Sequence, residues 1–134
     1  MRVVWKNLPL SMHQNARPAA LAAMAANEQG KFWEFHDKLF ANQQKLAKDD
    51  FVRYAQELGL DAKRFQDAVA GEKHKGQVDA DSAEAAALGV TGTPAFFVNG
   101  KFLSGAKPFE EFAKAINAEL LRLNIPIPPG APKS

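Results

Sequence analysis

The stretch GVTGTPAFFVNG, residues 89–100, decides the expected fold. Its first two glycines permit backbone angles that are closed to other residues. Thr93-Pro94 stands at the start of an apolar run, and an X-Pro bond adopts the cis form far more readily than any other peptide bond. The run Ala95–Val98 predicts a buried strand. Asn99-Gly100 predicts a type I′ hairpin turn, because that turn needs positive φ at both central residues, and the returning strand is then expected at residues 101–104.

Length and composition indicate a single soluble globular domain. The chain has 134 residues, of which 46% are hydrophobic and 24% are charged, and its net charge is +2. This balance predicts neither a nucleic-acid partner nor a membrane partner, and no apolar run approaches the roughly 20 residues that span a bilayer. The sequence contains no cysteine, which excludes disulfides and thiol chemistry within it.

The remaining sequence predicts one early strand, a series of helices and an extended tail. A strand is expected at 2–6, and the first helix is capped by Asn15, has Pro18 in its first turn and stops at Gly30. Four more helices follow: one at 31–42, one capped by Asp49 or Asp50 and ended by Gly59, one capped by Asp61 and ended by Gly71, and one at about 72–88. Pro108 begins a final helix, and a proline-rich extended tail is expected at 125–134.

Two of these helices carry a clear apolar face. The helix at 31–42 has apolar or boundary residues at 32, 35, 36, 39 and 40, which is the spacing of an amphipathic helix. In the final helix the same spacing places Phe109, Phe112, Ala113, Ile116, Leu120 and Leu121 on one face. Both faces are therefore expected to pack inward.

Four segments together resemble the DsbA-type thiol:disulfide oxidoreductases of the thioredoxin fold. They are VVWKNLPL at 3–10, the alanine-rich helix, KFWEFHDKLF at 31–40, and the proline loop with its hairpin. The resemblance implies an α/β chain with a truncated thioredoxin-like, DsbA-type fold, whose small sheet ends in the hairpin. It implies a domain over residues 1–124 with a helical insertion at about 31–75, followed by the tail at 125–134.

The Cys-X-X-Cys motif of that family is absent from this sequence. In the family a strand ending in this motif precedes the strand expected here at Val3, and it lies between that strand and the hairpin. Its absence predicts a fragment, a shortened chain, or a stand-alone protein that fills the gap by association. Because the hairpin edge needs a partner, we expect a homodimer with exchanged strands.

The resemblance also implies where a substrate would bind. Val90, Thr91, Gly92, Thr93 and Pro94 match the family loop beside which an extended polypeptide substrate pairs like an added strand. No catalytic residue and no cofactor is expected.

Metal binding is not expected either. His13, His36 and His74 show no pair with the i, i+4 spacing of a helical zinc site.

Three functional interpretations remain open at this point. The first is a DsbA-family domain that is inactive in thiol exchange because it has no cysteine. The second is a non-catalytic peptide-binding or assembly module that uses the proline groove. The third is part of an enzyme similar to kappa-class glutathione transferases. A Cys-X-X-Cys, a serine-containing equivalent or a true start codon upstream would discriminate among them. The family resemblance implies a periplasmic or other extracytoplasmic location, while the residues themselves leave the location open.

Overall fold

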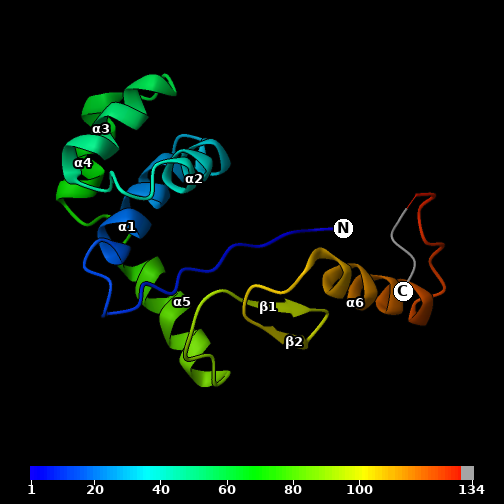
Figure 1. The fold of residues 1–134 in the computed structure, drawn as a ribbon. Coiled ribbons are helices and arrows are strands. Elements are labelled where there is room, and N and C mark those ends of the chain that lie inside the picture. Colours follow the sequence, from blue (N-terminus) through cyan, green and yellow to red (C-terminus); the bar gives the residue numbers. More distant parts are fainter. Residues whose placement is uncertain (131–134) are drawn as a thin grey trace. The chain divides into compact units, whose positions relative to one another are not determined.

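A computed structural model describes residues 1–130 of the chain. The chain divides into two compact units, Met1–Gly89 and a second unit that begins at Val90. The first unit is helical, and the second holds the hairpin and the last helix (Figure 1). The expected class, a mixed α/β thioredoxin-like fold of DsbA type, is confirmed.

Five helices make up the first unit. They are α1 (Ala16–Asn27), α2 (Phe32–Ala41), α3 (Lys48–Glu57), α4 (Ala62–Ala70) and α5 (Lys75–Ala87). Four of them lie within the ranges that the sequence predicts, whereas α3 begins at Lys48, before its predicted cap. Helix α1 packs against each of the other four, which makes it the central element of this unit.

Of the three predicted helix N-caps in this unit, only one makes the expected side-chain hydrogen bond. The Asp61 carboxylate accepts the backbone N–H of Arg64 at 2.9 Å, which confirms this residue as the N-cap of α4. The predicted cap of α3 is wrong, because the N-cap position is Ala47. Asp50 lies in the first turn, where its carboxylate accepts the Ala47 backbone N–H at 3.1 Å. Asn15 occupies the N-cap position of α1, but its side chain makes no capping hydrogen bond.

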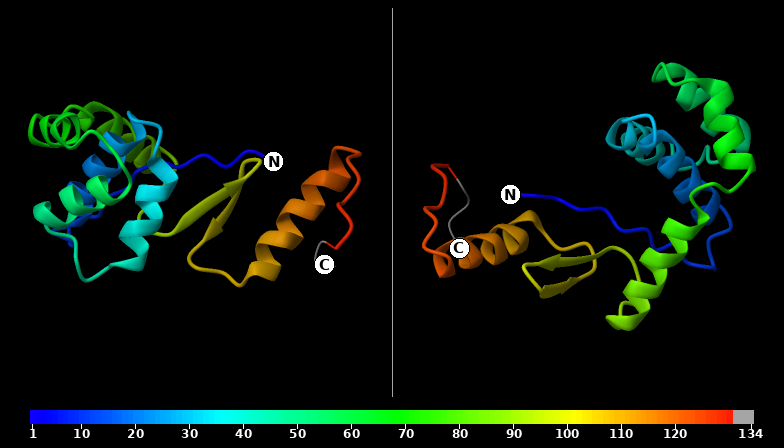
Figure 2. Two further views of the ribbon diagram at one scale, coloured as in Figure 1. Left: turned by 90° about the horizontal axis from the view of Figure 1, so that it is seen from above. Right: turned by 180° about the vertical axis from the view of Figure 1, so that it is seen from behind.

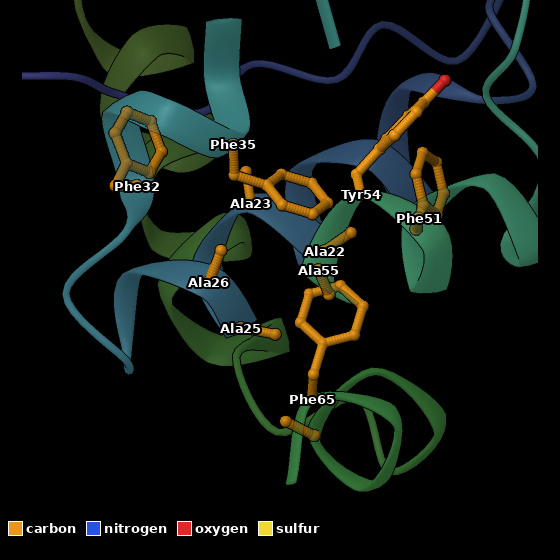
Figure 3. Close-up of a cluster of buried hydrophobic side chains, with 11 residues drawn as sticks. Ala22, Ala23, Ala25, Ala26, Phe32, Phe35, Phe51, Tyr54, Ala55 and Phe65 are labelled. Atoms are coloured by element: carbon orange, nitrogen blue, oxygen red, sulfur yellow. The ribbon is translucent and has the colours of Figure 1, made fainter. Parts of the chain in front are cut away.

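Aromatic rings from three helices surround the alanines of α1 and form the core of the first unit (Figure 3). The most deeply buried large side chains in this core are Phe35, Phe51, Tyr54 and Phe65, each no more than 2% exposed. The Phe35 ring lies 5.5 Å from Phe65 and 6.3 Å from Tyr54, between ring centroids. Because alanine side chains are small, the rings approach the α1 backbone closely, and the alanine-rich sequence serves packing.

The N-terminal segment corrects a prediction, because residues 2–6 form no strand. The strands within residues 1–130 are β1 (Ala95–Val98) and β2 (Lys101–Ser104), and these pair with each other. The segment is held instead through side chains of α5. Asn7 donates to Asp81, and Lys6 donates to Glu84 at 2.7 Å. A β-branched run predicts a strand only if a neighbouring strand supplies the ladder, and the described residues supply none here.

The second unit consists of the hairpin and α6 (Phe109–Arg122), coloured yellow to orange in Figure 2. The hairpin is antiparallel, with Ala95 opposite Ser104 and Val98 opposite Lys101. Asn99 and Gly100 have φ of +47° and +83°, as a type I′ turn requires. The predicted hairpin and turn are therefore confirmed.

The predicted inward face of α6 is only partly correct. Ala113 is buried, and the Phe112 ring packs against Phe96 of β1 with centroids 4.7 Å apart. Phe109 and Leu121 are 67% and 63% exposed, because a two-stranded hairpin is too small to cover the whole apolar stripe. Glu119 is one of the polar side chains that are buried instead.

The proline-rich tail is partly described. Residues 125–130 form neither helix nor strand, as expected. Residues 131–134 lie outside the described part.

Candidate functional site

The five residues expected to bind a substrate form the connection from α5 to β1. Gly89 has a φ of +72°, which turns the chain at the end of the helix. Val90 is buried, whereas residues 91–94 are exposed. The Thr93–Pro94 peptide bond is cis. The loop therefore presents four exposed residues directly before a strand.

The outer edge of β1 continues this loop. The Pro94 carbonyl accepts the Gly105 backbone N–H at 2.9 Å, so it is directed toward β2. Peptide groups alternate in direction along a strand, so Phe96 and Val98 also face β2, while Ala95 and Phe97 face outward. Within residues 1–130, no backbone hydrogen bond is found for the outward groups of Ala95 and Phe97. The strand can therefore accept one more strand at this edge.

The site carries no charge of its own. Residues 90–100 include no titratable side chain. Nearby, the Glu119 carboxylate accepts Lys101 Nζ at 2.8 Å and Arg122 Nε at 2.9 Å, and Asn99 Nδ2 at 3.4 Å. Hydrogen bonds from Lys101 and Arg122 lower the pKa of Glu119 to about 2, against the opposing effect of desolvation. These contacts connect the hairpin turn to α6. They involve no residue of β1, so the β1 edge remains uncharged.

The sequence analysis missed a buried polar pair in the first unit. The Asp81 carboxylate, with a side chain 3% exposed, accepts the backbone N–H of Asn7 at 3.0 Å and its side-chain amide at 2.8 Å. It also accepts the Gln77 amide at 2.8 Å. Burial opposes ionisation, yet these hydrogen bonds and the charge of Lys6 hold the pKa of Asp81 below its usual value. The sequence pattern that could have indicated the burial of Asp81 is its spacing: it follows Val78, which is fully buried, by three positions and therefore lies on the same face of α5.

A second missed feature is the group of basic side chains around Glu28. This carboxylate accepts Arg64 at 2.7 Å and Lys73 at 2.8 Å, and it lies 2.9 Å from His74 Nε2. Hydrogen bonds from Lys73 and Arg64 lower the pKa of Glu28 to about 2, against desolvation. The group joins the end of α1 to α4 and to the turn before α5. Its ion pairs therefore connect three segments of the first unit.

An exposed aromatic patch lies elsewhere in the first unit. It consists of Trp5, Trp33, His36 and Phe40, and it borders the buried Phe32 ring. The centroid of the His36 ring lies 4.9 Å from that of Trp5 and 4.5 Å from that of Phe40. Trp5, Trp33 and Phe40 are 42%, 47% and 58% exposed. The prediction that this face of α2 packs inward is therefore confirmed for the first turns of the helix, whereas Phe40 at its end is exposed to solvent.

Neither a metal centre nor a membrane span is found in the part of the chain that the structure describes. No three side chains of histidine, cysteine, aspartate or glutamate come together as metal ligands in residues 1–130. Over the same residues, every helix is too short or too polar to cross a bilayer. His36 lies 3.0 Å from Asp37 and His74 lies beside Glu28, so the two histidines are in separate surroundings.

Comparison with known proteins identifies the fold and the family. A solved thioredoxin-like oxidoreductase from Silicibacter pomeroyi superposes with a TM-score of 0.77 at 28% sequence identity, covering 87% of this chain and 66% of that one. Named relatives include the Na(+)/H(+) antiporter NhaA 3 of Salinispora tropica, 44% identical over 117 residues, and the Na(+)/H(+) antiporter NhaA of Herminiimonas arsenicoxydans, 39% identical over 106 residues.

The matches to the antiporters are partial. They cover 87% and 79% of this chain, but only 18% and 17% of the respective antiporters, so the chain spans less than a fifth of these relatives. The model of the DSBA-like thioredoxin domain matches residues 3–117, which is most of the sequence. The chain therefore belongs to the DSBA-like thioredoxin domain family.

Proposed function

We propose that this chain is a polypeptide-binding DsbA-like domain with no thiol:disulfide exchange activity of its own. The observation that carries the proposal is the uncharged outer edge of β1, which directly follows the exposed loop Thr91–Pro94. An extended segment of an unfolded protein can pair with Ala95 and Phe97 as an added strand, because main-chain hydrogen bonds of this kind do not depend on the sequence bound. The exposed side chains of Phe96 and Phe97 would then contact apolar residues of that segment.

The lack of exchange activity follows from composition. Exchange proceeds by attack of a thiolate on a disulfide sulfur, and the 134 residues contain no cysteine. A thiol taking part in such a reaction must therefore come from outside this sequence. The proposal includes an extracytoplasmic location, because the DsbA-type proteins that this chain resembles act on disulfides, which form and persist in oxidising compartments.

Antiporter activity is not proposed for this chain. The named antiporters share with it less than a fifth of their length, and their transport function is a property of those whole proteins.

Peptide binding is tested by fluorescence anisotropy with a labelled ten-residue peptide that contains one S-methylated cysteine. The decisive variant is Phe97→Pro, which removes an outward N–H without removing a hydrogen bond of the β1–β2 ladder. The matched control is Phe97→Ala, which keeps the N–H and loses the ring. We expect affinity to fall at least tenfold in Phe97→Pro and less in Phe97→Ala. Equal binding by the wild-type chain and Phe97→Pro would overturn the proposal.

Exchange activity is tested separately by the reduction of insulin with dithiothreitol. The chain is expected to leave the rate of insulin precipitation at the uncatalysed value. A rate above that value, in a preparation free of contaminating oxidoreductases, would contradict the second half of the proposal.

A further inference from the structure

The hairpin turn contains an asparagine that a glycine follows, Asn99-Gly100. The sequence has seven asparagines, and the residues that follow the other six are Leu8, Ala16, Glu28, Gln43, Ala118 and Ile125. Glycine carries no side chain that shields its backbone nitrogen. The Gly100 nitrogen is therefore the least hindered of the seven backbone nitrogens that directly follow an asparagine.

The two groups of this turn that can react with each other are accessible. Asn99 and Gly100 are exposed, and no atom beyond the neighbouring residues lies within 4 Å of the position where a Gly100 side chain would begin. Within residues 1–130 the Gly100 N–H donates no backbone hydrogen bond. The Asn99 amide is loosely held, because Nδ2 donates to Glu119 Oε2 at 3.4 Å, beyond the usual range of about 2.7–3.2 Å.

The closed turn nevertheless keeps these two groups apart. Asn99 has a φ of +47° and occupies the first central position of a type I′ turn, for which ψ is about +30°. The Gly100 nitrogen and the Asn99 Cβ then lie nearly trans about the Cα–C bond, because the substituents of a tetrahedral carbon are roughly 120° apart. Attack of this nitrogen on Cγ closes a five-membered ring, in which the same two atoms must be nearly eclipsed. The attack therefore needs a rotation that breaks the turn.

We infer that Asn99 is a deamidation site, which the closed hairpin protects and which reacts when the turn opens. In the open turn the Gly100 nitrogen gives up its proton to water or hydroxide and attacks Cγ of Asn99. A new C–N bond forms, the bond from Cγ to Nδ2 breaks and the leaving nitrogen departs as ammonia, so a succinimide ring remains. Water then adds to one of the two ring carbonyls and opens the ring, which leaves aspartate or isoaspartate. Water is the only co-reactant, and no atom is oxidised or reduced.

Either product places a carboxylate beside Glu119 of α6. The Glu119 carboxylate accepts Lys101 Nζ at 2.8 Å and Arg122 Nε at 2.9 Å. Hydrogen bonds from these two cations lower the pKa of Glu119 to about 2, so this side chain is ionised at neutral pH. The Asn99 amide donates to the Glu119 carboxylate, whereas a carboxylate at position 99 repels it and competes with it for Lys101. Deamidation thus weakens the contact between the turn and α6.

Isoaspartate has a second consequence, because its main chain runs through the former side chain and is one methylene longer. The turn joins Val98 to Lys101, which face each other in the β1–β2 register, and this register depends on a loop of two ordinary residues. Aspartate keeps that length, and Asp-Gly also suits a type I′ turn. Isoaspartate does not, so each event that yields it leaves the hairpin without its original turn. The turn is at the opposite end of β1 from Thr91–Pro94, so deamidation there does not depend on the proposed peptide binding.

The site and its protection are tested by peptide mapping with mass spectrometry after incubation at neutral pH and 37 °C, once in buffer and once in denaturing guanidinium chloride. Conversion of an amide to a carboxylate raises the mass by about one unit, and the other six asparagines are controls within the same chain. In the denaturant we expect Asn99 to deamidate at least tenfold faster than any of them, and in buffer at least tenfold slower than in the denaturant. A rate in the denaturant no higher than that of the other six would overturn the site, and equal rates in the two solutions would overturn its protection.

The effect on the turn is tested by amide hydrogen exchange of β1 and β2 in two variants. Asn99→Asp adds the carboxylate, while the matched control Asn99→Gly removes the amide without adding a charge and keeps a sequence that suits a type I′ turn. We expect the hairpin amides to exchange at least threefold faster in Asn99→Asp than in Asn99→Gly at neutral pH. Equal or slower exchange in Asn99→Asp would overturn the proposed weakening of the contact with Glu119.

Discussion

The two compact units differ in where their large apolar side chains lie. In the first unit the rings of Phe35, Phe51 and Phe65 are at most 1% exposed, whereas in the second unit those of Phe96, Phe97 and Phe102 are 39% or more exposed. The helical unit closes its core around the alanines of α1, while the hairpin unit leaves both of its faces open. The difference indicates that the first unit is held by the packing of its own rings, whereas the described part of the second unit buries far less of its aromatic surface.

The largest expected effect tests the core of the helical unit. Replacing Phe35 by alanine should lower the free energy of unfolding by about 3–5 kcal/mol, because a fully buried ring leaves a cavity. The control is Phe40→Ala on the same helix, where the ring is 58% exposed and the loss should stay below about 1 kcal/mol. Urea denaturation followed by circular dichroism measures both variants. Losses of equal size would show that burial does not separate the two faces of α2.

A smaller effect tests how the N-terminal segment is held. Asp81→Ala removes the acceptor of two Asn7 hydrogen bonds, and leaving such buried donors unpaired costs about 1–3 kcal/mol. The control is Asp79→Ala on the same helix, whose exposed ion pair with Arg17 should contribute less than about 1 kcal/mol. The same denaturation experiment compares them. If Asp79→Ala proves as damaging as Asp81→Ala, the segment is not anchored through Asp81.

The smallest expected effect is a loss of stability at low pH, to which one glutamate in each unit contributes. The pKa of Glu28 and that of Glu119 are lowered to about 2, from an ordinary value of 4.5. A lowered folded-state pKa adds stability above the unfolded value, and this contribution is lost as the pH falls from about 4.5 toward 2. We therefore expect the thermal midpoint to decrease over that range and to decrease less in Glu28→Gln. Midpoints measured by circular dichroism from pH 7 to pH 2.5 test this, and parallel curves for the two proteins would contradict it.

Local patterns in the sequence predicted the elements that depend on local physics. The Asn99-Gly100 turn needs only two residues that tolerate positive φ, and Asp61 caps α4 by reaching three residues along the chain. For these two features the neighbouring residues supply the cause, and the sequence shows them. The loop Val90–Pro94 was assigned instead from the family resemblance, and its role in binding a substrate stays a prediction.

Features that depend on distant residues could not be predicted in this way. Residues 2–6 have the composition of a strand, but a strand also needs a ladder partner, and composition does not supply one. In the sequence, Asp81 is one of several charged residues in a polar helix. Its burial depends on Asn7, which lies 74 positions away and contacts it only in the folded chain. The burial of Glu119 likewise follows from where Lys101 and Arg122 lie, not from the apolar spacing of α6.

The aromatic patch of the first unit also determines what optical spectroscopy can report. The two tryptophans, Trp5 and Trp33, and the single tyrosine, Tyr54, all belong to the helical unit. Tryptophan emission therefore follows the melting of that unit alone, and opening of the hairpin would pass unseen. Amide hydrogen exchange at β1 and β2 supplies the missing signal. If the hairpin amides exchange under conditions where the emission is unchanged, the two units unfold separately.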